Sequence, residues 1–230
     1  MKEIILVLCF FTIILFKFIF KINIKKAKKL EENKELQKIT DKFPENIDIA
    51  KDMLKMLGNT DVKIEQAKDT KTSLYIAITN KIVIADLKDN YGRIQTIAHE
   101  CTHSVQDKTL LMFNFIFSNV EIVYFIISLI LTITNVFTNV LLQICILLIL
   151  FFIKYATRSY LEIDAMTKSR YLAEKYMDKK NLCTKDEQEK LLMEYDKINN
   201  VGIPFTLYYL LTNSLIRIIL YIAIAIIIWN

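Results

Sequence analysis

The stretch Ile97–Asp107, IAHECTHSVQD, holds both histidines of this 230-residue chain. His99 and His103 are four residues apart, and residues at that spacing lie one above the other on one face of a helix. Two such imidazoles can bind a single ion, and imidazole is a common zinc ligand. Glu100 is placed to take a proton from metal-bound water and later to deliver it to a leaving amine. The pattern is the HExxH motif of zinc metalloproteases; its other interpretation is a helix with two surface histidines.

A zinc site of this kind needs a third protein ligand, and the chain has no third histidine. This excludes the HExxHxxGxxH arrangement and requires a carboxylate. A helix that continued past His103 would carry Asp107 away from the ion. The carboxylates that we consider are Asp107, Glu121, Glu162, Asp164 and Glu174.

Two of these carboxylates, Glu121 and Glu162, are the stronger candidates. Glu121 lies near the spacing of soluble enzymes with two histidines and one glutamate, but in a strongly apolar stretch where a charge is costly. Glu162 begins EIDAMTKSRYLAEKYM, an amphipathic stretch just after the apolar block. We therefore favour Glu162, whose other interpretation is a surface ion pair with Arg158, and keep Glu121 as the alternative. Asp164 either orients a ligand histidine or is a solvated surface residue.

The composition indicates a membrane protein. Hydrophobic residues make up 53% of the chain, with 3 Gly and 2 Pro, so long helices in lipid are expected. The net charge of +5 comes largely from lysines beside apolar runs, which indicates membrane-flanking charge and argues against a nucleic-acid partner. The four cysteines show no CxxC spacing, so no disulfide framework is expected.

Hydropathy divides the chain into five predicted segments. These are an N-terminal transmembrane helix (1–23), a cytoplasmic zincin-like segment with HExxH (24–109), a hydrophobic helical hairpin (110–153), a cytoplasmic helical segment with the third ligand (154–202) and a C-terminal transmembrane helix (203–230). The hairpin is predicted because one helix of that length would overshoot the bilayer about twofold. Its turn is expected near Asn135–Asn139, and Glu121 leaves open a partly re-entrant hairpin that spans only after that residue.

Lysines after the first apolar run predict its orientation. Because positive charge stays on the cytoplasmic side, both polar segments and the active site are expected to face the cytoplasm. A signal peptide is disfavoured, since no small-residue cleavage site follows the run. The cluster consists of Lys21, Lys25, Lys26, Lys28 and Lys29.

The polar segments predict a small α+β part. Pro44 and Gly58 bound a helical pattern, and short strands are expected in 61–67, 74–78 and 82–85, with a turn at 79–81. A helix over Arg93–Asp107 carries HExxH, and a loop is expected near Asn181–Thr184. The fold class is thus mainly α: a multi-pass membrane protein with a small zincin-like part made of a helix, short strands, the HExxH helix and a glutamate helix.

The order of these elements resembles the bacterial neutral zinc metallopeptidases of the membrane, the YugP-like family. AHECTHSVQD is similar to the family pattern AHE-x-GHA-x-QD, and Glu162, Asp164 and Ala165 match its E-x-D-A helix. The resemblance implies His99, His103 and Glu162 as zinc ligands and Glu100 as catalytic base. Cys101, Thr102 and Ser104 depart from the pattern. The chain resembles less closely the integral-membrane gluzincins of the prenyl-endopeptidase and heat-shock protease type. Those enzymes carry an aspartate four residues after the ligand glutamate, and Met166 occupies that position here.

The sequence thus predicts a zinc-dependent metalloendopeptidase of the cell membrane, acting on protein or peptide substrates that could include membrane proteins. Two other functions remain open. One is a catalytically silent metal-binding membrane scaffold. The other is a small channel or transporter with a polar path along Glu121, Asn135, Asn139 and Gln143.

Overall fold

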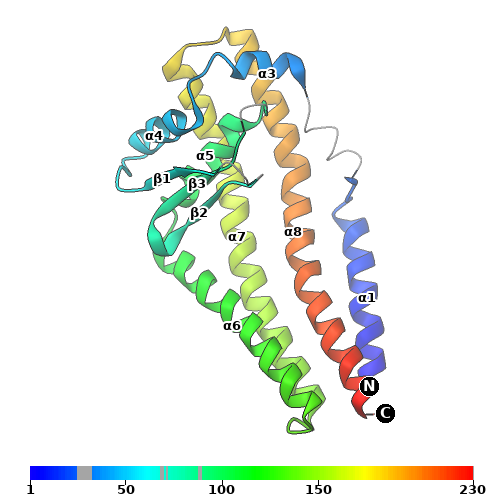
Figure 1. The fold of residues 1–230 in the computed structure, drawn as a ribbon. Coiled ribbons are helices and arrows are strands. Elements are labelled where there is room, and N and C mark those ends of the chain that lie inside the picture. The colour runs from blue at the N-terminus through cyan, green and yellow to red at the C-terminus, as the bar shows by residue number, and fades with distance from the viewer. Residues whose placement is uncertain (25–32, 68–69, 71, 88–89, 230) are drawn as a thin grey trace. The chain divides into compact units, whose positions relative to one another are not determined.

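The computed structural model describes residues 1–24, 33–67, 70, 72–87 and 90–229 (Figure 1). Four lysines of the predicted cluster, Lys25, Lys26, Lys28 and Lys29, lie outside the described residues. The chain forms two compact units, which are described separately below. Unit 1 comprises 1–22, 112–160 and 204–230, and unit 2 comprises 23–111 and 161–203.

Unit 2 contains a small sheet of three strands, β1 (Lys63–Gln66), β2 (Leu74–Ile76) and β3 (Lys81–Ile84). The strand order is β1-β3-β2; β3 is parallel to β1 and antiparallel to β2, so β2 forms one edge. A short 3₁₀ turn, η1 (Ala77–Thr79), joins β2 to β3. Asn80 takes a left-handed conformation after it, with φ +46°, which asparagine tolerates better than most residues.

Three short helices accompany this sheet: α3 (Lys34–Thr40), α4 (Asn46–Met56) and α5 (Arg93–His103). The side chain of Asn33 caps α3, accepting hydrogen bonds from the backbone N–H groups of Glu35 and Leu36. After α4 the chain turns at Gly58, whose φ of +69° suits a residue without a side chain. Both α4 and α5 contact strands of the sheet, and they pack against each other.

The core of unit 2 joins this α+β part to the ends of two long helices. Ile82 and Ile84 of β3 are fully buried, and so are Ile94 and Ile97 of α5. The long helices contribute Leu172, Ala173, Tyr176, Met177, Leu191, Leu192 and Tyr195 to the same cluster. Burial of this much apolar surface is the main force that holds α5 in place.

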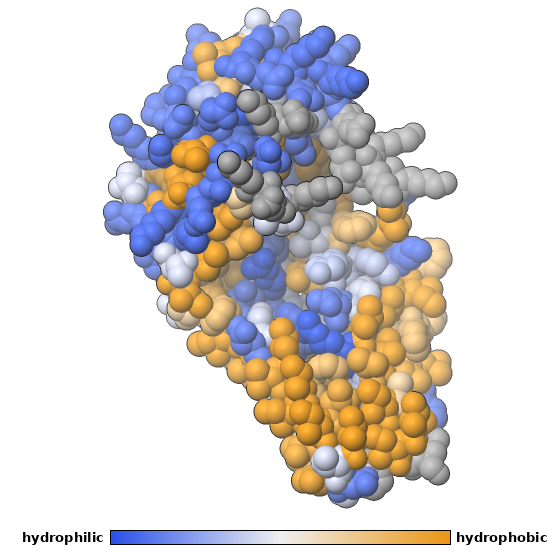
Figure 2. Space-filling view, in the orientation of Figure 1, coloured by the Kyte–Doolittle hydropathy of each residue, from blue (hydrophilic) through white to orange (hydrophobic). Residues whose placement is uncertain are grey.

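Three of the described helices are long and apolar enough to cross a membrane: α6 (Lys108–Ile133), α7 (Val140–Lys180) and α8 (Lys185–Trp229). The protein is therefore mainly helical and membrane-associated. The N-terminal helix α1 (Lys2–Ile19) has 18 residues and carries Lys2, Glu3 and Lys17, so the predicted fourth span stays a prediction. Figure 2 shows hydrophobic side chains over the visible face of unit 1.

The apolar block 110–153 is divided between α6 and the start of α7, with residues 134–139 between them. Asn135 in this turn has φ +59°, and the Asn139 side chain accepts a hydrogen bond from the N–H of Leu142 at the start of α7. Since α6 begins at Lys108 and is unbroken through Glu121, a re-entrant break at that residue is not found.

Three predicted segment boundaries, 109/110, 153/154 and 202/203, fall inside continuous helices. Along α7 and α8 the hydropathy changes without any residue that ends the helix. A Cβ at Gly202 would lie 2.7 Å from the Cε atom of Met166 on α7, which is the mobile end of a flexible side chain. Pro204 lies inside α8, as proline can in membrane helices where neighbouring groups satisfy the freed carbonyl.

Unit 1 contains a cluster of three charges from three helices, in which a buried carboxylate pairs with two half-buried cations. The Oε2 atom of Glu121 on α6 accepts hydrogen bonds from Lys154 Nζ at 2.6 Å and from Arg217 Nη1 at 2.7 Å. Lys154 on α7 also donates to Ser214 Oγ at 3.3 Å. The Glu121 side chain is only 4% exposed, and a charge buried in an apolar bundle is tolerated when it is paired.

We predict that Glu121→Gln lowers the stability of the purified protein in detergent by about 1–3 kcal/mol, because it leaves two half-buried cations without their anion. Thermal unfolding measures the loss. Removing all three charges, as Glu121→Gln with Lys154→Met and Arg217→Met, should recover most of it. The exposed Glu189→Gln serves as the control. A single variant as stable as wild type would show that the cluster is not stabilising.

Candidate metal centre

Buried contacts on both sides fix the start of α5. Arg93 is 4% exposed and donates hydrogen bonds to the carbonyl oxygens of Thr40, Phe43 and Pro44 and to the side chain of Asn46. This guanidinium ties α5 to the segment that links α3 and α4.

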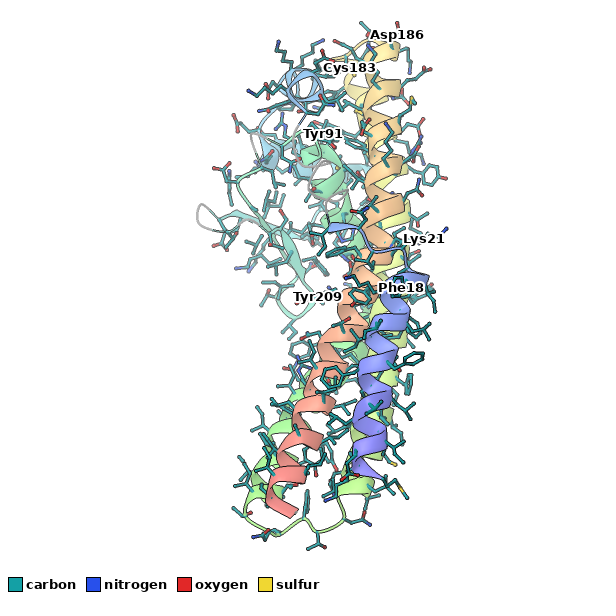
Figure 3. The ribbon with its side chains drawn as sticks, turned by 90° about the vertical axis from the view of Figure 1, so that its right-hand side faces the viewer. Phe18, Lys21, Tyr91, Cys183, Asp186 and Tyr209 are labelled. Atoms are coloured by element: carbon teal, nitrogen blue, oxygen red, sulfur yellow. The ribbon has the colours of Figure 1, made fainter. Side chains whose placement is uncertain are left out.

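The long helices hold the same end of α5. Tyr91, labelled in Figure 3, precedes the helix, and its carbonyl accepts a hydrogen bond from Tyr195 of α8 at 3.0 Å. Gln95 donates to Asn199 of α8 at 2.8 Å, and Asn199 in turn donates to the carbonyl of Met166 on α7. The HExxH helix is thus bound to α7 and α8 by both apolar packing and directed hydrogen bonds.

The structure brings together the three residues predicted as metal ligands. One ligand atom from each of His99, His103 and Glu162 lies within 4.8 Å of the other two. The two Nε2 atoms are 3.1 Å apart. Glu162 Oε2 lies 3.5 Å from His99 Nε2, and Glu162 Oε1 lies 3.7 Å from His103 Nε2. Two imidazoles from α5 and one carboxylate from α7 could therefore hold a metal ion.

The ligand group is buried on one side and partly open on the other. The side chain of His99 is 20% exposed, whereas those of His103 and Glu162 are 7% and 11% exposed. The His99 edge is therefore the more accessible part of the group. Glu100, the next residue of α5, is 6% exposed.

Two further carboxylates that the sequence offered as ligands bond elsewhere. Asp107 Oδ1 accepts a hydrogen bond from the N–H of Leu110 at 2.8 Å and so caps α6. Glu174 pairs with Arg170 along α7.

Two predicted site residues lie outside the ligand group. Asp164 Oδ2 accepts a hydrogen bond from Gln106 at 2.9 Å, and Asp164 Oδ1 pairs with Lys168 at 2.6 Å. Glu121, the alternative ligand, is the anion of the charge cluster in unit 1.

Gln106 is the site residue that the sequence did not single out. Its Oε1 atom lies 2.8 Å from Nδ1 of His103, and its Nε2 atom donates to the carbonyl of Leu161 at 2.8 Å as well as to Asp164. The signals available in the sequence were the Q of the pattern AHE-x-GHA-x-QD and its position three residues after a ligand histidine, but its partners on α7 lie far along the chain.

The departures from the family pattern are accommodated inside unit 2. The Thr102 hydroxyl donates to the carbonyl of Ala98 at 2.8 Å, and the Ser104 hydroxyl donates to that of Cys101 at 2.6 Å. Burial raises the pKa of the Cys101 thiol far above its ordinary value, and the nearby Glu100 carboxylate adds to this shift. Cys101 is therefore an uncharged core residue and not a thiolate ligand.

Comparisons with protein-family models, with curated proteins and with solved structures find no match to this chain. The metal centre is therefore argued from its own residues.

We predict that the purified protein binds one divalent metal ion per chain and that Glu162→Ala abolishes this binding, since two imidazoles alone hold a metal weakly. Glu121→Ala is the control that should retain the ion. Metal analysis after dialysis against trace zinc measures both. Loss of the ion in Glu121→Ala but not in Glu162→Ala, with both variants folded, would assign the third ligand to Glu121.

Proposed function

We propose that this protein is a membrane zinc metallopeptidase in which His99, His103 and Glu162 bind zinc and Glu100 is the general base. The observation that carries the proposal is the convergence of the two HExxH histidines with one carboxylate of α7. This set of two histidines and one glutamate is the donor set of known zinc peptidases, and it leaves a further position for water or substrate.

The spacing of the ligand atoms fits the proposed ion. Zinc bound at about 2.0–2.1 Å in a tetrahedron holds its ligand atoms roughly 3.4 Å apart. The two Nε2 atoms are 3.1 Å apart, near that value, and one ligand atom from each of the three residues lies within 4.8 Å of the other two. Two nitrogens and one carboxylate also favour zinc over Ca²⁺ and Mg²⁺, which prefer oxygen ligands.

A zinc ion held by His99, His103 and Glu162 would supply polarisation of the scissile carbonyl and a lowered pKa of water. The carboxylate of Glu100 takes the proton of the attacking water and delivers it to the amine of the leaving fragment. An extended peptide could add to the free edge of the sheet at β2, because α5 contacts that strand. Protein or peptide chains, including membrane proteins, are the substrate class that we propose.

The channel alternative is weakened by the partners of its four residues. Glu121 is held by two cations, and Gln143 accepts a hydrogen bond from Tyr124 of α6. Asn139 caps α7, and Asn135 takes the left-handed conformation of the turn before it. Each of these residues thus has a structural role in the bundle.

We further propose that the protein lies in the cell membrane with unit 2 in the cytoplasm. The support is the lysine-rich stretch that follows the first apolar run, since such charge is retained on the cytoplasmic side.

We predict that Glu100→Gln lowers peptide hydrolysis by about 10²–10⁴-fold, because the amide cannot accept the proton of water. Its zinc content should equal that of wild type, since Glu100 is not a proposed ligand. Cleavage of an internally quenched peptide library by protein in nanodiscs measures the rate, and Glu189→Gln is the control. A wild-type protein that holds zinc but cleaves nothing would favour the scaffold alternative.

Orientation can be tested at the turn between α7 and α8. Figure 3 shows Cys183 and Asp186 there, and Asp186 is exposed. In a Cys183→Ser background, we predict that a membrane-impermeant maleimide labels Asp186→Cys in inside-out vesicles but not in intact cells. The background protein without the new cysteine is the control. Labelling in intact cells would place unit 2 outside.

A further inference from the structure

We propose that Gln106 is a positioning residue that sets the tautomer of His103 and joins the HExxH helix to the turn of α7 that carries Glu162. This inference rests on metal binding by the proposed centre, but not on peptide hydrolysis. It starts from the hydrogen bonds of a single side-chain amide.

The partners of Gln106 determine which way its amide points. The carbonyl oxygen of Leu161 and the carboxylate of Asp164 lie 2.8 Å and 2.9 Å from one end of the amide. Both partners are acceptors, so this end must be the NH₂ group of the amide. The other end, 2.8 Å from His103 Nδ1, is therefore the oxygen.

The amide orientation in turn places the proton of His103. An amide oxygen only accepts hydrogen bonds, so Nδ1 of His103 must donate and therefore carries a proton. In the neutral ring this leaves the lone pair on Nε2. That nitrogen is the one that faces His99 Nε2 and Glu162. The ligand atom is thus prepared for a cation before any ion arrives.

The same amide connects two elements that are distant in the sequence. Gln106 stands in the turn after α5, whereas Leu161 and Asp164 flank Glu162 on α7. A single side chain thereby bonds to one ligand histidine and to two residues that lie on either side of Glu162 in the sequence. Residues that orient metal ligands in this way typically change metal affinity by about 10–100-fold when they are removed.

We predict that Gln106→Met weakens zinc binding by about 10–100-fold, measured by competition with a chromogenic chelator. Gln95→Met is the matched control, because it removes another α5-associated glutamine that bonds to a long helix but not to a ligand histidine. That control should keep wild-type affinity whatever it does to the unfolding temperature.

Conservative variants separate the two roles. In Gln106→Glu one carboxylate oxygen can still accept a hydrogen bond from His103. The other oxygen cannot donate to Asp164 or to the Leu161 carbonyl, so the hydrogen bonds to α7 are lost. Adding Asp164→Asn supplies a donor and should recover most of the lost affinity. A residue needed only for folding would not show this rescue.

The tautomer can be read without metal, because the chain has 2 histidines. With ring-¹⁵N histidine and a tag that lacks histidine, nitrogen–proton correlation spectra contain only the rings of His99 and His103. We expect the Nδ1–H form of His103 in wild type and in Gln95→Met, and its loss in Gln106→Met.

Four outcomes would overturn the proposal. Wild-type affinity in Gln106→Met, or an unchanged tautomer in that variant, would overturn this inference alone. Failure of the Gln106→Glu and Asp164→Asn pair to recover affinity would overturn the link to α7. A wild-type protein that binds no zinc would overturn the proposed function and this inference together.

Discussion

The convergence of three electron-pair donors is the constraint on which unit 2 depends. Two imidazole nitrogens and one carboxylate lie within 4.8 Å of one another in a largely buried place. Such groups do not attract each other unless a proton or a cation lies between them, so other forces must hold their helices together. The apolar core shared by β3, α5, α7 and α8 supplies most of that force. Arg93, Tyr195 and Asn199 add directed hydrogen bonds that fix how α5 lies.

Membrane association and site chemistry share the same long helices. α7 contributes Lys154 to the charge cluster of unit 1 and Glu162 to the ligand group of unit 2, without a break between them. α8 likewise contributes Arg217 to unit 1 and Asn199 to unit 2. The hydrophobic core of the small α+β part is completed by residues of α7 and α8. Other parts of these two helices are apolar enough to cross a membrane.

Local patterns in the sequence predicted much of this arrangement. The four-residue spacing of His99 and His103 places both rings on one helix face, and the alternation around Ile82 and Ile84 indicates a strand. The continuity of α8 was not predicted, because the change in hydropathy at 202/203 was interpreted as the start of a separate transmembrane helix. Gln106 and the partners of Glu121 could not be predicted either, since each depends on contacts between helices far apart in the sequence.

The histidine ligands precede α6 in the sequence and the carboxylate ligand follows it, which matters for how the protein is made and inserted. His99 and His103 are synthesised before the hairpin of α6 and α7 is inserted, and Glu162 is synthesised only after the hairpin turns back. If α6 crossed the bilayer and α7 did not bring the chain back, the histidines and Glu162 would lie on opposite faces of the bilayer. With the proposed topology, the three-ligand group would therefore assemble only after the hairpin has returned the chain to the side on which its histidines lie.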